Sequence, residues 1–344
     1  MKRESNIELL RIVAMFMIVV HHYCVNSGLT QLFDYNNITG NTLLVQFMSF
    51  GGKVGVNIFF IISGFFMINS STFKWEKVVK IIFQILFYGI VVMAFLMFLG
   101  YSYSIKTIIE PLLMPFIHTS SFISAYLFVY ILTSVINKML KAITEKEFLF
   151  LIAVLIFYFS ILSIYPLIDT WNYFGWAFTC YVVGAYLSMY GKKHKFYNSL
   201  KISSICGLGG VLIIWISMLV YDFIGVKYLH TINWRFFMAD ANKITVFLVA
   251  IFMFMSFKNI KVKYNKVINL VATSCFGVLL IHANSDMMRQ WLWKDFLHNT
   301  EWFQSSYLWL HMLLSCVGIY IVCTIIDICR IKFIEKPLFD RFRK

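Results

Sequence analysis

Four ionisable side chains lie in the first apolar segment, residues 7–27, and their spacing gives the first indication of chemistry. They are Glu8, Arg11, His21 and His22. Ionisable groups at membrane depth cost about 2.5 to 3.5 kcal/mol on insertion scales, so each needs a reason. At about 100° per helical residue, Arg11 and His22 differ by about 20°, and Glu8 lies about 60° from Arg11 on the same side. His21 points about 80° the other way. We therefore expect Glu8, Arg11 and His22 to form one polar stripe that faces the interior of a helix bundle.

This stripe suits acid–base or nucleophilic chemistry. A neutral histidine acts as a general base or as a nucleophile, and a guanidinium group holds anions. Arg11 and His22 are separated by about 16 Å along the helix. The alternative is that Glu8 pairs with Arg11 near the membrane interface and that a histidine hydrogen-bonds between helices. The first segment by itself leaves both interpretations open.

Other polar residues stand at the ends of apolar segments or inside them. Asn57 precedes an aromatic run that contains Ser63-Gly64, and the dipeptide indicates close helix packing. His282 and Asn284 close a later apolar segment. The seven cysteines are scattered without a CxxC pair, and the chain has no P-loop, GxGxxG or HExxH motif. We therefore expect no metal site and no nucleotide-phosphate loop of these kinds.

The composition predicts a membrane protein. The chain is 60% hydrophobic and only 13% charged, whereas soluble domains carry about 25% charged residues. So much apolar surface has to face lipid. The net charge of +14 does not indicate nucleic-acid binding, because the basic residues lie in short loops between apolar segments. We expect one transmembrane domain that spans residues 1–344.

The apolar segments predict an all-α bundle of about ten transmembrane helices. The first segment is too long for a signal peptide and has no small-residue cleavage site. With the N-terminus inside, the cytoplasmic loops and tails hold 22 of the 30 Lys and Arg residues, and the outer loops with their edges hold six. This bias favours an even number of helices with both termini in the cytoplasm. The expected spans are 7–27, 43–68, 78–100, 122–138, 147–165, 173–190, 202–221, 240–257, 267–284 and 307–329.

Several short motifs follow one another in a specific order along this helix pattern. They are Glu8-Leu9-Leu10-Arg11, the Arg-x10-His spacing that ends at His22, Asn57-Ile58-Phe59-Phe60, Ser63-Gly64-Phe65, Trp176 through Gly184-Ala185-Tyr186, Asn242, Phe276 through His282, Leu292-Trp293 and Ile334-Glu335-Lys336-Pro337. Together they resemble the membrane-bound acyltransferase-3 family, in its polysaccharide-modifying branch. The fourth segment, around Ala125–Tyr130, looks shorter than is usual in that family and lacks its Trp.

The resemblance implies an O-acyltransferase, most simply an O-acetyltransferase. It would move acetyl from cytoplasmic acetyl-CoA to a sugar hydroxyl of a cell-surface polysaccharide or its lipid-linked precursor. His22 would be catalytic and Arg11 would bind the donor. Asn57, His282 and Asn284 would bind the acceptor substrate, and no metal is expected.

The expected location is the bacterial cytoplasmic membrane, and the expected partners are membrane lipid, the glycan acceptor and proteins of polysaccharide assembly. A transporter or flippase of a glycan or acyl carrier is one alternative, since a polar stripe also suits a conducting path. A non-catalytic subunit of a polysaccharide assembly complex is the other, and the short fourth segment leaves it open. No inverted repeat supports the transporter.

Overall fold

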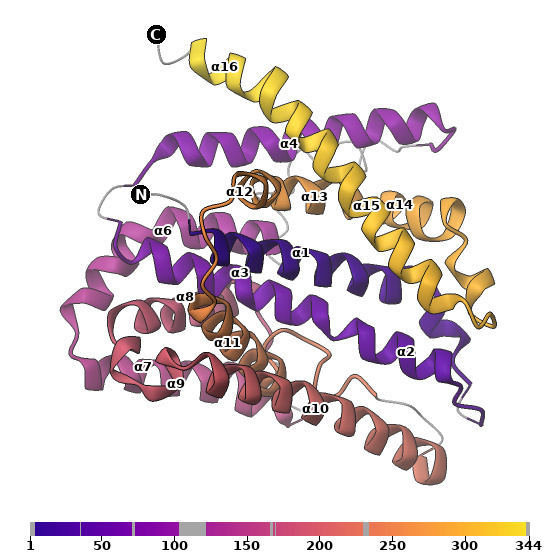
Figure 1. Cartoon of the computed structure of the whole chain (residues 1–344), viewed down its shortest axis with the longest axis horizontal. Helices are drawn as coiled ribbons and strands as arrows, with labels where there is room; N and C mark the ends of the chain where they lie inside the picture. The colour runs from indigo at the N-terminus through magenta and orange to yellow at the C-terminus, as the bar shows by residue number, and fades with distance from the viewer. Residues whose placement is uncertain are drawn as a thin grey trace. The chain divides into compact units, whose positions relative to one another are not determined.

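The computed structural model describes residues 4–34, 36–70, 73–102, 122–165, 168, 170–229 and 234–341, and no strand occurs among them. Figure 1 shows the helices. Their bounds are α1 Ser5–Asn26, α2 Gly40–Ser49, α3 Gly51–Met67, α4 Trp75–Phe98, α6 Phe122–Ala142, α7 Glu145–Ile156, α8 Tyr173–Met189, α9 Lys195–Asn198, α10 Leu200–Ile224, α11 Ile244–Asn259, α12 Lys266–Thr273, α13 Cys275–His282, α14 Asp286–Gln290, α15 Leu308–Arg330 and α16 Lys336–Arg341. The all-α prediction is confirmed for this part of the chain.

Seven helical stretches among the described residues are long and apolar enough to cross a membrane, and a bent pair makes the number up to eight. All ten predicted segments coincide with helices. However, α8 and α11 contain only 17 and 16 residues. The count of ten and the cytoplasmic location of the termini therefore stay predictions. The seven stretches are Ser5–Asn26, Gly40–Met67, Trp75–Phe98, Phe122–Ala142, Glu145–Ile164, Leu200–Tyr228 and Leu308–Arg341.

The predicted span 267–284 is broken rather than continuous. It consists of α12 and α13, which meet at Ser274. After α13 the chain bends by 93° into the stretch Asp286–Phe296. Ser285 caps this stretch by accepting a hydrogen bond from the backbone N–H of Met288. His282 therefore lies at the last turn of α13, immediately before the bend.

The helices group into two compact units. The first comprises Met1–Gly52, Phe87–Tyr103 and Val262–Lys344, and the second comprises Lys53–Leu86 and Ser104–Lys261. In the first unit α1 packs against α2, α12, α13 and α15. In the second unit α8 packs against α6 and α7, and α10 packs along α11. The first unit thus surrounds the helix that carries the predicted polar stripe.

Two glycines in the second unit let α3 and α8 approach closely. A Cβ on Gly64 would lie 2.0 Å from the Tyr181 carbonyl oxygen, and one on Gly184 would lie 2.2 Å from the Ile61 carbonyl oxygen. Neither position admits a side chain without separating the helices. Ser63 Oγ donates to the Phe59 carbonyl at 2.8 Å within its own helix. The interpretation of Ser63-Gly64 as a packing site is therefore confirmed.

Candidate functional site

A pair of hydrogen-bonded histidines joins α1 to the end of α13. Nδ1 of His22 lies 2.9 Å from Nε2 of His282, and the ring centroids are 5.1 Å apart. His282 is fully buried, and His22 is half-buried. The sequence indicated these residues separately, His22 as catalytic and His282 as substrate-binding. The structure brings them together across 260 residues of sequence.

The second hydrogen bond of His282 assigns the protons in this pair. Nδ1 of His282 lies 2.6 Å from the carbonyl oxygen of Val278. A carbonyl oxygen only accepts, so this Nδ1 carries the proton. With both rings neutral, Nε2 of His282 then accepts from Nδ1–H of His22. The lone pair of His22 is therefore on Nε2. The hydrogen bond to His282 holds the ring at its other nitrogen and so orients Nε2, as a general base requires.

Aromatic rings surround the pair. Trp293 is fully buried, and its ring meets Tyr23 and His282 edge-on at centroid distances of 5.8 and 6.3 Å. The Tyr23 hydroxyl lies 2.8 Å from Nδ1 of His311, on which Trp302 stacks with a centroid distance of 4.6 Å. Sequence reasoning missed His311 and Trp302, because neither residue stands out from its own segment. In the sequence, Trp293 was identified only as part of the Leu292-Trp293 motif.

His21 has a separate place, as the helix phase predicts. Its Nδ1 bonds the Ser49 carbonyl oxygen at the end of α2. A Cβ on Gly52 would lie 2.4 Å from the His21 ring. His21 thus packs where α2 meets α3, whereas His22 faces α13.

Arg11 pairs with Glu8 one turn earlier on α1. Arg11 Nη1 lies 3.5 Å from Glu8 Oε1, and the side chains are 33% and 8% exposed. This is the pairing that the sequence offered as an alternative. Because a third of the Arg11 side chain is exposed, the pairing still leaves it accessible to an anion. The described residues contain no group of His, Cys, Asp and Glu suited to a metal ion.

The two predicted asparagines make hydrogen bonds within the protein. Asn57 is fully buried in the second unit. Its Nδ2 donates to the Ala241 carbonyl at 2.8 Å, and its Oδ1 accepts from Trp176 Nε1 at 2.8 Å. Asn284 Nδ2 donates to the Leu280 carbonyl at 3.1 Å, just beyond His282. These contacts hold helices and helix ends in place, and substrate binding by either asparagine stays a prediction.

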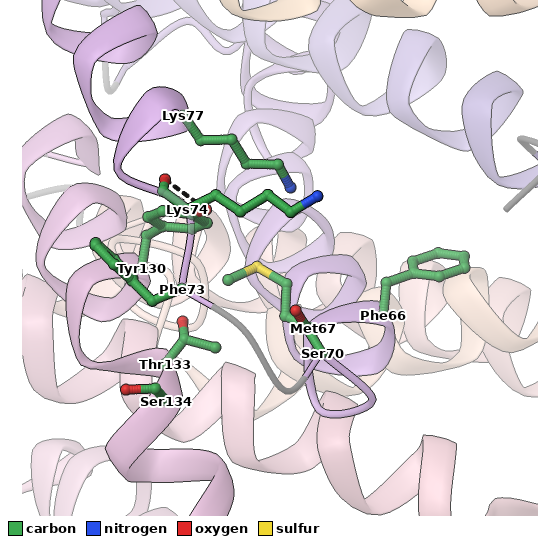
Figure 2. Close-up of a pocket in the computed structure, with 9 residues that line it drawn as sticks. All are labelled: Phe66, Met67, Ser70, Phe73, Lys74, Lys77, Tyr130, Thr133 and Ser134. Atoms are coloured by element: carbon green, nitrogen blue, oxygen red, sulfur yellow. Dashed lines mark hydrogen bonds between the residues drawn. The ribbon is translucent and has the colours of Figure 1, made fainter.

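A small cationic cavity lies in the second unit (Figure 2). It encloses about 200 Å³, and the side chains of Lys74 and Lys77 extend beside each other at its edge. The Tyr130 hydroxyl donates to the Lys74 carbonyl at 3.5 Å. Two ammonium groups with neighbouring hydroxyls suit a phosphate or another anion. Both lysines are among the 22 Lys and Arg residues of the predicted cytoplasmic loops and tails. The lining consists of Phe66, Met67, Ser70, Phe73, Lys74, Lys77, Tyr130, Thr133 and Ser134.

Comparison with protein families matches the chain to a family model. The model of the acyltransferase-3 family, described as an acyltransferase domain, matches residues 4–328. No curated protein and no solved structure matches the chain significantly. The matched residues include nearly the whole chain and both members of the histidine pair.

Proposed function

We propose that this chain, which belongs to the acyltransferase-3 family, transfers acetyl from acetyl-CoA to a sugar hydroxyl. As a family member it is a membrane acyltransferase. The proposed acceptor is a cell-surface polysaccharide or its lipid-linked precursor, and the proposed location is the bacterial cytoplasmic membrane. The observation that carries the proposal is the hydrogen bond from His22 to the buried His282. It supports a base whose reactive nitrogen is held in a defined orientation.

In the proposed reaction His22 is the general base. Its Nε2 takes the proton of the sugar hydroxyl, and the sugar oxygen attacks the thioester carbon. The C–S bond breaks, the acetyl ester forms on the sugar, and the coenzyme A thiolate leaves. The thiolate then takes the proton from His22, which returns to its starting state. His282 is a positioning residue in this scheme, because it fixes the tautomer and the direction of the His22 ring.

A covalent route uses the same nitrogen. His22 Nε2 attacks the thioester carbon, the C–S bond breaks, and coenzyme A leaves as a thiolate. The sugar oxygen then attacks the acyl-histidine, the N–C bond breaks, and the thiolate takes the proton of the sugar hydroxyl. The two routes differ in whether label from acetyl-CoA stays on the protein when no acceptor is present. Rapid acid quench of the purified protein with labelled acetyl-CoA separates them. Label on a His22 peptide indicates the covalent route, and its absence during active turnover indicates direct transfer.

The distribution of Lys and Arg along the chain gives the proposed membrane side of Arg11 and His22. Both termini are taken as cytoplasmic, so Arg11 lies near the cytoplasmic end of α1 and His22 lies about 16 Å farther along the helix axis. A pantetheine arm entering past Arg11 would bring the thioester toward His22. Labelling of a cysteine introduced at His194 by an impermeant thiol reagent added outside would contradict this sidedness.

Arg11 is the proposed donor contact on α1. Arg11→Ala is expected to raise the KM for acetyl-CoA by about tenfold, the size of one lost charge-assisted hydrogen bond. Arg11→Lys keeps the charge but loses the guanidinium fork, so it is expected to retain part of the affinity. Both variants are measured in purified, reconstituted protein. An unchanged KM in Arg11→Ala would leave the Glu8 pairing as the only role of Arg11.

Lys74 and Lys77 provide a separate test of anion binding. The double change Lys74→Ala with Lys77→Ala is expected to weaken binding of inorganic phosphate by about tenfold, because the anion loses charged partners. Lys138→Ala with Lys141→Ala is the matched control, since both lysines are exposed and have the same spacing at the end of α6. Equal affinities in the two double variants would mean that the cavity binds no anion. Calorimetric titration with inorganic phosphate measures both affinities.

The direct test of activity uses purified protein with labelled acetyl-CoA. The acceptors are the surface glycan and its lipid-linked precursor, both extracted from cells that lack this protein. The proposal predicts label in the glycan that mild base releases as acetate. Absence of such label with the wild-type protein, at an acetyl-CoA concentration shown to bind, would contradict the proposed reaction. Labelled glycan produced equally by His22→Ala would contradict only the assigned base.

A further inference from the structure

An elongated apolar groove lies beside the histidine pair in the first unit. It encloses about 730 Å³, within the range of small-molecule sites. His282 contributes to its wall, so the groove reaches the residue that orients His22. The remaining lining comes from α4, Ile281 of α13, the chain after α13, and α15.

The groove has the dimensions and the access expected for a hydrocarbon chain. Along α15 it extends from Leu314 to Ile326, which corresponds to about 18 Å of helix axis. Leu314 and Val322 in its wall are 63% and 55% exposed. In a membrane-spanning helix such side chains face lipid, so the groove is open to the bilayer from the side. A molecule dissolved in the bilayer can enter it without crossing water.

We propose that this groove binds the polyprenyl chain of a lipid-linked sugar and thereby presents the sugar to His22. The inference rests on the proposed function and narrows its acceptor to the lipid-linked precursor. The acyl donor does not explain the groove, because acetyl has two carbons and acetyl-CoA is an anion that arrives from water. A carrier chain is apolar along its whole length, stays in the bilayer, and would lie along α15 past His282.

Gly318 offers a way to fill the groove without disturbing the protein. It lines the groove, and a Cβ built on it meets no atom within 4 Å. A tryptophan there therefore projects into the space of the proposed chain. Gly209 on α10 is the matched control, because it is also a helical glycine with no atom within 4 Å of its Cβ, and it lies outside the groove.

The test measures binding and does not depend on turnover. The full chain is reconstituted in vesicles of phosphatidylethanolamine and phosphatidylglycerol, with a polyprenyl phosphate that carries a diazirine in its chain. After illumination, mass spectrometry quantifies labelled peptides from residues 286–297 and 308–330. Gly318→Trp is expected to reduce this labelling by about tenfold, because occupied apolar space excludes the chain. Gly209→Trp and Gly318→Ala are expected to label as wild type does.

A second probe separates the carrier from ordinary lipid. Phosphatidylethanolamine with a diazirine in one acyl chain is expected to label these peptides weakly, and excess polyprenyl phosphate should not change that labelling. Equal labelling by both probes would overturn the inference and make the groove a general lipid contact. Unchanged polyprenyl labelling in Gly318→Trp would overturn it as well. If both probes label the protein as expected but wild-type protein transfers no acetyl, the proposed function is wrong, whereas the groove still binds the carrier chain.

Discussion

Acetyl transfer is expected to disappear in His22→Ala and to continue in His21→Ala. The two residues are neighbours with the same size and polarity, but they face different partners. His22 bonds His282, whereas His21 bonds the Ser49 carbonyl and packs against Gly52. Loss of a general base lowers a rate by about 100- to 10,000-fold. Loss of the acyl carrier in the covalent route would be at least as severe.

The measurement is glycan acetylation in cells that carry each variant, normalised to the amount of protein in the membrane. His282→Ala serves as a third variant. As a positioning residue it should lower kcat and leave the KM for acetyl-CoA unchanged, which a purely structural defect would not do. Normal acetylation by His22→Ala would refute the mechanism. Loss in His21→Ala alone would mean that the orientation of α1 has been misinterpreted.

The largest expected effect on stability comes from Asp327→Ala. Asp327 is fully buried in the first unit. Its Oδ1 accepts from the Tyr88 hydroxyl at 2.8 Å and from Arg330 Nε at 2.9 Å. Arg330 is also buried and donates to Glu335 at 2.6 Å. Asp327→Ala takes one of two carboxylates from the buried Arg330 and leaves the Tyr88 hydroxyl without its acceptor. Removing one partner of a buried ion pair costs about 3 to 5 kcal/mol, and the Glu335 contact that remains places the expected loss at about the lower of these values.

Asp286→Ala is the matched control for this prediction. Asp286 pairs with Arg289 at the same i,i+3 spacing, but its side chain is 96% exposed. Exposed pairs of this kind contribute little to stability. Chemical unfolding of the purified variants in detergent compares the two losses. A similar decrease in the free energy of unfolding for both variants would contradict the buried-pair account.

The sequence predicted the helices well because their signal is local. An apolar stretch of membrane length identifies a span without knowledge of its neighbours. The phase of α1 could likewise be derived from the separation of Arg11 and His22, and the structure places His21 and His22 against different partners. The break at Ser274 and the bend after His282 were not predicted, because the segment has the apolar composition of one continuous span.

The partners of the site residues could not be predicted, because they depend on packing between distant segments. Nothing near His22 in the sequence indicates that the end of α13 meets it. Arg330 was counted among the cytoplasmic charges, yet it is buried against Asp327. Counting charges and finding apolar runs both consider residues along the chain without their packing partners. Neither method can detect an ion pair that forms when a helix packs.

Acetate released by mild base from surface glycan reports directly whether this protein acetylates glycan. Glycan is prepared from source cells with the gene intact, with the gene deleted, and with the deletion complemented by wild type or His22→Ala at equal protein level. We expect base-labile acetate to be lost on deletion, to return with wild type and to stay absent with His22→Ala. Unchanged acetate in the deletion strain would contradict this expectation.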